Sequence, residues 1–257
     1  MKCKLLVLWC AACVAAICAE KAAEPPKPVA HTVRAIEGWT VHVDNRLLDG
    51  DDAEIGGRAL QLLGMRLADI KLVVAPDRLK ALQEVPMWLD RTHGRLTSMQ
   101  YHPSAGWLRE NGYSAAMEKC VHIPDARGFA DPRHQQRQPW CVLHELAHAY
   151  HDRVLGFDEK RIKAAWQQAK DSGRYDAVLL IDGRTVKHYA MTNEKEFFAE
   201  MSEAYFGVND FYPFNRAELL KENPELHRLL REIWGPVPDP AKEAPEATQK
   251  KALKSSQ

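Results

Sequence analysis

Two histidines and a glutamate near the middle of the chain have the residue types and the spacing of a metal-dependent hydrolase. His144 and His148 are four residues apart, and Glu145 directly follows the first histidine. On a helix, residues four apart lie on the same face, so both imidazoles can reach one metal ion. Zinc suits imidazole ligands, and Glu145 projects beside the pair, where it can take a proton from an activated water molecule. The triplet predicts a zinc-dependent hydrolase with Glu145 as general base.

The five-residue pattern is short enough to arise by chance, so its surroundings matter. Val142, Leu143, Leu146 and Ala147 give the segment an apolar surface of its own. This composition favours a packed helix that bears the two histidines. The alternative is a helix on which they are merely solvent-facing or partly buried.

A catalytic zinc ion needs a third protein ligand and keeps one position for water. His151 lies two helical turns after His144, about 10 Å along the helix axis, which is too far to share the ion. Val154 stands ten residues after His144, where a third histidine would be expected. The third ligand must therefore come from another part of the chain.

An acidic segment further along the chain supplies candidates for this ligand. Glu196 and Glu200 are one helical turn apart, with aromatic residues between them. Two carboxylates on one face of a half-buried helix are costly without a cation or hydrogen-bond donors, which favours Glu196 as ligand. Glu194 competes for this role but has Phe198 rather than a carboxylate four residues on. A solvated acidic face is the other interpretation.

The two motifs together resemble a known family. The segment Tyr189–Glu200, downstream of His-Glu-x-x-His, is similar to the catalytic domain of anthrax lethal factor and related secreted metallopeptidases, which are zincins with a glutamate as third zinc ligand. The resemblance covers about residues 95–235. It implies that His144, His148 and Glu196 hold one zinc ion per chain.

The resemblance also implies roles for three other side chains. Glu145 would be the base, Tyr189 would donate a hydrogen bond to the developing oxyanion, and Glu200 would orient a ligand histidine. Without the resemblance, Tyr189 at the end of a hairpin is typical of a packing residue, and His188 of a rim or structural histidine. The partner would be a peptide or protein substrate, and an intact Glu145 favours an enzyme over a catalytically silent, zinc-stabilised binding module.

The pattern of elements predicts an α+β fold, because strand-like runs come mostly first and helices mostly after. By resemblance it would be a zincin-like fold, with a small mixed sheet packed on the histidine-bearing helix and a mostly helical C-terminal part. The expected strands are 40–43, 71–75, 96–102 and 119–123, with a hairpin of 175–181 and 184–190. The expected helices are short ones within 77–90 and longer ones at 53–69, 136–155, 158–171, 193–205 and 216–233.

The ends of the chain differ in composition from its body. The start is basic at Lys2 and Lys4, followed by an apolar run too short for a comfortable membrane span. We therefore expect an exported protein, secreted or periplasmic, without a stable anchor after cleavage; an uncleaved anchor is the alternative. Equal numbers of basic and acidic residues, 35 each, argue against nucleic acid as a partner. The expected organisation is a signal peptide at 1–19, a flexible spacer at 20–30, a metallopeptidase domain at 31–235 (an N-terminal α/β part 31–94 and a catalytic core 95–235), and a disordered tail at 236–257.

Cleavage after Ala19 would leave only Cys120 and Cys141. An exported protein can pair two such cysteines, but two separate buried thiols fit equally well. The run Lys119–Ile123 precedes the histidine-bearing helix by one loop and ends at Pro124. It is the best candidate for an edge strand that binds an extended substrate, and a Cys120–Cys141 disulfide would then fix the wall of the cleft.

Overall fold

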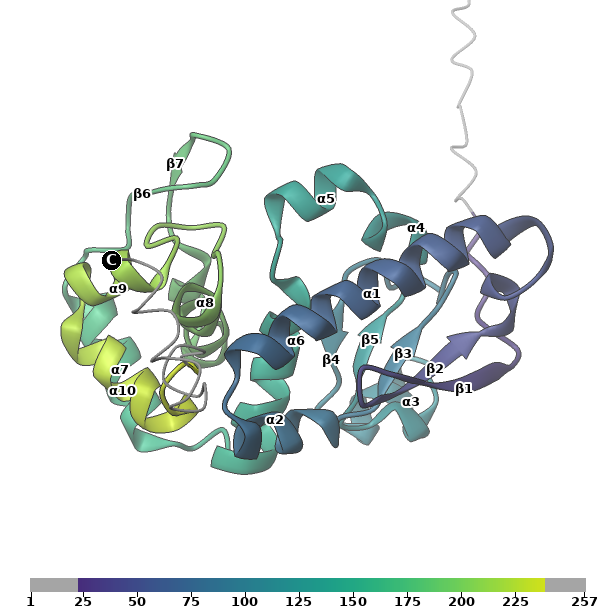
Figure 1. Ribbon diagram of the computed structural model, residues 1–257, viewed down its shortest axis with the longest axis horizontal. Helices are drawn as coiled ribbons and strands as arrows, with labels where there is room; N and C mark the ends of the chain where they lie inside the picture. Colours follow the sequence, from purple (N-terminus) through teal and green to yellow (C-terminus); the bar gives the residue numbers. More distant parts are fainter. Residues whose placement is uncertain (1–22, 239–257) are drawn as a thin grey trace, which may run out of the picture.

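A five-stranded mixed sheet occupies the N-terminal part of the computed structural model, which describes residues 23–238 (Figure 1). Its strand order is β1-β2-β3-β5-β4. The β1/β2 and β4/β5 pairs are antiparallel, and β2/β3 and β3/β5 are parallel. The predicted α+β class, with a small mixed sheet, is confirmed. The strands are β1 (His31–Ile36), β2 (Trp39–Asp44), β3 (Met87–Leu89), β4 (Gln100–Tyr101) and β5 (Val121–Ile123).

In the middle of the sheet, the apolar residues of β2 and β5 alternate with polar ones, so one face of these strands is apolar. Val41, Met87 and Val121 lie side by side in register and are fully buried. They belong to the main hydrophobic core, which also holds Leu63 and Leu67 of helix α1 (Ala53–Val73). One face of the sheet therefore contributes to this core.

Helix α1 extends past the predicted end at residue 69. The expected strand 71–75 is wrong, because Ile70 continues the buried stripe of the helix and its carbonyl accepts a hydrogen bond from Val74. Pro76 then begins α2 (Pro76–Gln83), as proline is favoured in the first helical turn. The prediction of only short helices within 77–90 missed β3, which is three residues long.

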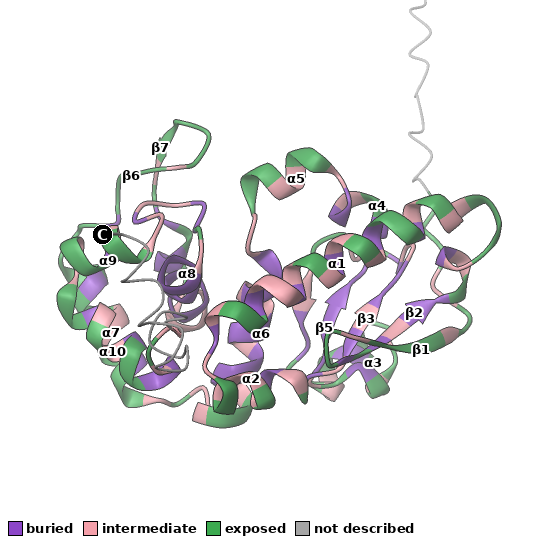
Figure 2. Cartoon of the chain, in the orientation of Figure 1, coloured by how far each residue is buried: buried purple, intermediate pink, exposed green. Residues whose placement is uncertain are grey.

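The C-terminal part is mostly helical, as predicted. Figure 1 shows α6 between the sheet and the remaining C-terminal helices, and Figure 2 shows that α8 is buried along most of its length. The predicted helix 216–233 is divided at Asn223, which caps the second half. The helices are α3 (Ala105–Glu110), α4 (Ala126–Phe129), α5 (Pro132–Arg137), α6 (Cys141–Tyr150), α7 (Lys160–Asp171), α8 (Glu194–Phe206), α9 (Arg216–Glu222) and α10 (Pro224–Trp234).

Two predicted elements are shorter than expected. The helix predicted at 136–155 begins at Cys141 and passes into a π-helical turn at His151–Leu155. The hairpin keeps its turn, with Gly183 at a φ of 91°, but its strands are only β6 (Val178–Leu179) and β7 (Thr185–Val186). Tyr189–Met191 forms a 3-10 turn instead of continuing the second strand.

The predicted spacer has no helix or strand in its described part, residues 23–30. It nevertheless contacts the body: Thr92 Oγ1 donates to the Pro26 carbonyl at 2.7 Å, and Lys27 Nζ donates to the Gly112 carbonyl at 2.6 Å. The predicted signal peptide, and all of the predicted tail after residue 238, lie outside the described residues. Across residues 23–238, no helix has the length and apolar character that a membrane crossing requires.

Candidate metal centre

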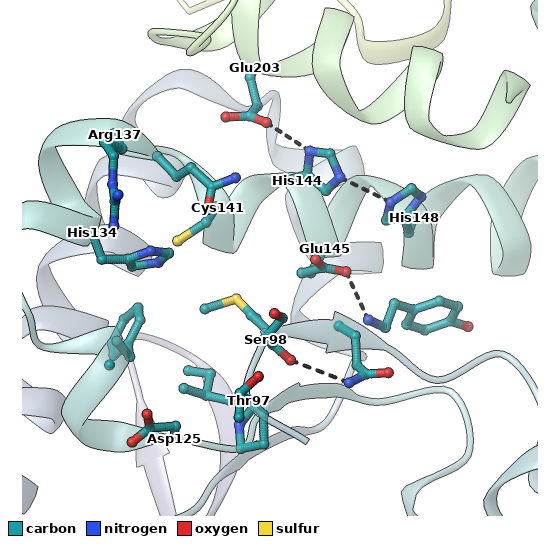
Figure 3. A pocket seen from close by; sticks show the side chains of 18 of the residues that line it. Thr97, Ser98, Asp125, His134, Arg137, Cys141, His144, Glu145, His148 and Glu203 are labelled. Atoms are coloured by element: carbon teal, nitrogen blue, oxygen red, sulfur yellow. Dashed lines mark hydrogen bonds and ion pairs between the residues drawn. The ribbon is translucent and has the colours of Figure 1, made fainter. Parts of the chain in front are cut away.

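Helix α6 points its polar triplet away from the hydrophobic core. Val142, Leu143 and Leu146 are buried in the core, whereas His144 and His148 line a pocket and have side chains 13% and 12% exposed. The predicted packed helix is confirmed, and the two histidines lie on one face of it (Figure 3).

Glu196 of α8 meets the two histidines, as predicted. Its Oε2 lies 3.1 Å from His144 Nε2 and 3.3 Å from His148 Nε2, and the two imidazole nitrogens are 3.1 Å apart. Ligand atoms placed tetrahedrally at zinc bond lengths of 2.0–2.1 Å are about 3.3–3.4 Å apart. The three atoms therefore have the spacing of one face of a tetrahedral site, and they form a group that can hold a metal ion.

The hydrogen bond of His144 Nδ1 also supports the assignment of His144, His148 and Glu196 as metal ligands. This nitrogen lies 2.8 Å from Glu203 Oε1 and donates to that carboxylate. In the neutral ring, Nε2 then carries a lone pair directed at the lone pairs of Glu196 and near Nε2 of His148. Such an arrangement is repulsive unless a cation lies between the atoms.

Without a metal, a proton takes this place. Burial lowers the pKa of His144, but hydrogen bonds to Glu196 and Glu203 outweigh it and raise the pKa well above its usual value. Burial likewise raises the pKa of Glu196, yet the two histidines together hold it well below its usual range. The residues thus fit a positive charge at the centre of the group.

Glu196 is fixed by the start of α8. Asn193 caps the helix and accepts from the backbone N–H groups of Lys195 and Glu196. Phe197 and Phe198 are buried directly after it, so the first turn cannot rotate away from α6. The local sequence thus sets the direction of the glutamate side chain.

The orienting carboxylate is Glu203, not the predicted Glu200. Glu200 Oε1 is 3.7 Å from His144 Nδ1, beyond hydrogen-bond distance, and its Oε2 has no hydrogen-bond partner. Burial and then the Glu203 charge raise the pKa of Glu200 well above its usual value. Glu203 had a signal in the sequence, since it lies seven residues after Glu196 on the same helix face. Glu203 lies one helical turn beyond Glu200, and there it reaches His144.

Glu145 points to the sheet rather than into the ligand group. Its Oε2 accepts a hydrogen bond of 2.8 Å from the backbone N–H of Tyr101 in β4, drawn as a dashed line in Figure 3. Burial raises the pKa of Glu145. The carboxylate therefore lies beside the ligand group without joining it, which suits a base.

The pocket has a volume of about 600 Å³ and brings the predicted metal ligands together with Glu145, Tyr189 and Glu200. Tyr189 also lines the pocket and is 48% exposed, so it is half-buried, as the plainer interpretation expected, and its place in the pocket is open to a substrate. His188 is a structural histidine, as expected: it is buried and stacked on Phe211. His151 is buried between Phe157 and Phe198 and is not part of the ligand group.

The predicted substrate strand at Lys119–Ile123 is wrong as an edge strand. β5 pairs with β3 on one side and with β4 on the other, so both of its edges are already hydrogen-bonded. The outer strand at this end is β4, and residues 97–101 line the pocket. The run 96–102 was predicted as a strand, but its place at the edge depends on tertiary pairing.

The predicted disulfide is also wrong. Cys120 and Cys141 are both free and buried. Cys120 packs with Leu108 and Met117 in a small separate cluster, while Cys141 belongs to the main core and lines the pocket. The two thiols serve different hydrophobic clusters, so the reading as separate buried thiols holds.

Searches with the whole chain against protein-family models, curated proteins and solved structures returned no match.

Proposed function

We propose that this chain is an exported zinc metallopeptidase with a zincin-like fold. The observation that carries the proposal is the convergence of three lone-pair-bearing atoms, of His144, His148 and Glu196, at tetrahedral spacing on the wall of a pocket. Zinc is the metal chosen, because two imidazoles and one carboxylate form a common catalytic zinc set. Only three side chains of this group converge, which leaves a coordination position for water.

The chain's own residues supply the proton transfers. When bound, zinc supplies the charge that polarises a peptide carbonyl and lowers the pKa of a water molecule. Glu145, held by the Tyr101 N–H, takes the proton of the attacking water and passes it to the leaving amine. Burial raises the pKa of Glu145 toward neutral pH, and a group whose pKa lies near the working pH can act both as a base and as an acid.

Two further side chains assist in different ways. Tyr189, exposed in the same pocket, donates its hydroxyl hydrogen to the oxyanion that forms on the peptide carbonyl. Glu203 accepts a hydrogen bond from His144 Nδ1–H and so holds the ring in the tautomer that leaves the other nitrogen free for the metal. The first residue acts on the substrate, and the second acts only through His144.

The substrate is an extended peptide that pairs with β4. This strand lies at the end of the sheet and has no partner on its outer side among residues 23–238. Backbone pairing to such an edge gives affinity with little dependence on peptide sequence. Residues 97–101 also line the pocket, so a bound peptide would pass beside Glu145.

A catalytically silent zinc module fits the same residues less well. A structural zinc site is normally closed by four side chains, whereas this group has three and opens to a pocket. A binding module also has no use for a carboxylate held beside the metal without ligating it. The position of Glu145 therefore favours the enzyme.

The deciding experiment is a peptide-library digest read by mass spectrometry. We expect the purified chain to cleave a mixed library, a zinc chelator to stop cleavage, and added zinc to restore it. Glu145→Gln is the matched control, because it keeps the metal ligands. Zinc binding without any cleavage by the unaltered chain would favour the binding module.

Export is tested separately. The basic start and uncharged run of residues 1–19 support a signal peptide. Mass spectrometry of the exported protein should find a new N-terminus near Ala19 or Glu20. Recovery of intact Met1 from exported material would favour an anchor.

A further inference from the structure

A second group of one carboxylate and two imidazoles lies on one face of the five-stranded sheet, outside the pocket. Asp90 follows β3, His93 lies in the next loop, and His122 is the middle residue of β5. Their side chains are almost completely buried, at 0%, 6% and 0% exposed. None of them lines the pocket of the first centre.

Strand alternation explains how these residues meet. Trp88 pairs with His122, so both project to the same face of the sheet, and Asp90 projects there too, because it is two residues after Trp88. Their neighbours in sequence, Leu89 and Ile123, project to the opposite face and lie in the main core. The sheet thus has one apolar face and one face that collects ligand residues.

The ligand atoms are close together. Asp90 Oδ2 lies 2.6 Å from His93 Nδ1 and 2.8 Å from His122 Nε2. One ligand atom from each of the three side chains lies within 4.8 Å of the others. The donor set, one carboxylate oxygen and two imidazole nitrogens, is the same as in the first centre.

The outer atoms of the group are held as those of metal ligands usually are. His122 Nδ1 lies 3.1 Å from His102 Nε2, and Asp90 Oδ1 lies 2.7 Å from His31 Nε2. Ligand histidines and carboxylates in proteins typically have such hydrogen-bonded partners on their far side. Both partners fix the orientation of the ligand rather than occupying its metal-facing atom.

The group contains a buried carboxylate that no lysine or arginine of the described residues neutralises. Asp90 is fully buried and forms ion pairs only with histidines; no Lys or Arg of residues 23–238 pairs with it. Its two carboxylate oxygens instead face imidazole nitrogens of His31, His93 and His122 at 2.6–2.8 Å. A buried carboxylate of this kind is costly unless hydrogen-bond donors or a cation compensate it.

We propose that Asp90, His93 and His122 form a second, structural site for a divalent transition-metal ion, with zinc the best fit by ligand type. The ion would tie the end of β3 and the following loop to β5. Because β5 pairs with β4, which holds Glu145, this site stabilises the strand next to the catalytic edge.

Binding leaves the number of protons unchanged. In the metal-free group, His93 Nδ1–H and His122 Nε2–H donate to Asp90 Oδ2. On binding, each ring stays neutral and its proton moves to its other nitrogen. His102 changes tautomer in the same way, its proton moving from Nε2 to Nδ1, so that its Nε2 can accept from His122 Nδ1–H. The facing atoms, now 2.6 and 2.8 Å apart, must also separate by about 0.5–0.7 Å to reach a tetrahedral edge of about 3.3 Å.

The test is metal stoichiometry after stripping with chelator, reloading with zinc and gel filtration. We expect two zinc ions per chain in the unaltered protein, one in Glu196→Ala, one in Asp90→Asn, and none in the double variant. His42→Asn is the matched control, because His42 projects from β2 beside the group and stacks on Trp88 but is not a member of it. It should keep two.

His93→Gln provides a second variant that alters only a loop residue, in case Asp90→Asn fails to fold. In the Glu196→Ala background, zinc should raise Tm by several degrees, and His93→Gln should abolish that rise. No zinc in Glu196→Ala, or two zinc ions retained in His93→Gln, would overturn the second site. The Glu196→Ala arm needs no peptidase activity, so it reports on this site even if the proposed function fails.

Discussion

The two groups of one carboxylate and two imidazoles differ in where their protons are. In the pocket, His144 Nδ1–H donates to Glu203, and the three inner atoms lie 3.1–3.3 Å apart. In the sheet, His93 and His122 direct N–H groups at Asp90, and the distances are 2.6 and 2.8 Å. The first spacing is that of metal ligands, and the second that of charge-assisted hydrogen bonds.

The comparison shows that the outer partner of a histidine decides what its inner nitrogen is ready to bind. A carboxylate behind His144 holds one proton on Nδ1, so that in the neutral ring the inner nitrogen carries a lone pair. Another histidine behind His122 can either donate or accept, so the inner nitrogen can carry a proton or a metal. We therefore expect the pocket group to bind zinc more tightly than the sheet group, which must first exchange its hydrogen bonds.

The largest expected effect is the loss of activity when Glu145, which belongs to neither ligand group, is replaced. Glu145→Gln should lower kcat/KM about 10²–10⁴-fold, the usual contribution of a general base. Zinc content should be unchanged, because the metal ligands remain. Kinetics on a library-derived peptide, with zinc measured on the same sample, check this. Near-full activity in this variant would contradict the base assignment.

Tyr189→Phe should lower kcat about 10²–10³-fold, as the loss of one oxyanion donor does. KM and zinc content should change little, because the hydrogen bond forms in the transition state. Steady-state kinetics separate the two constants. An unchanged kcat would leave Tyr189 as an exposed residue of the pocket rim.

Glu203→Gln tests the comparison itself, by replacing the carboxylate behind His144 with an amide. Zinc affinity in the pocket should fall about 10–100-fold, the typical effect of removing such a partner. Glu200→Gln is the matched control and should have a smaller effect, since Glu200 lies 3.7 Å from the same nitrogen. Competition with a fluorescent chelator measures both. Equal losses would mean that the two carboxylates act together.

The smallest expected effect is the acid sensitivity of the sheet group in the metal-free protein. Burial lowers the pKa of His102 to about 3, so below a pH of about 6.5 the unfolded chain takes up a proton that the folded chain does not. The contribution of His102 to the free energy of unfolding is therefore complete above pH 6.5. It falls by at most about 1.4 kcal/mol per pH unit as the pH drops toward 3. Urea unfolding at pH 7 and pH 5 should show a smaller difference in His102→Gln. An identical pH dependence in both proteins would exclude His102 as a cause.

Local spacing was enough to predict much of the pocket. His144, Glu145 and His148 depend on one helix, and Glu196 on the first turn of another, so periodicity fixed which side chains share a face. The α+β class also followed from local patterns. The missed Glu203 was within reach of the same reasoning, because it continues the face of Glu196 by two turns.

The sequence by itself determined the faces of helices and strands, because a side chain's direction follows from the helical or strand period. Tertiary structure alone decided which elements meet. It made β4 the edge and β5 an interior strand, put Cys120 and Cys141 into different hydrophobic clusters, and gathered Asp90, His93 and His122 on one side of the sheet. The physical reason is that strand order and helix docking depend on the total burial of apolar surface over segments far apart in the chain, which no local pattern records.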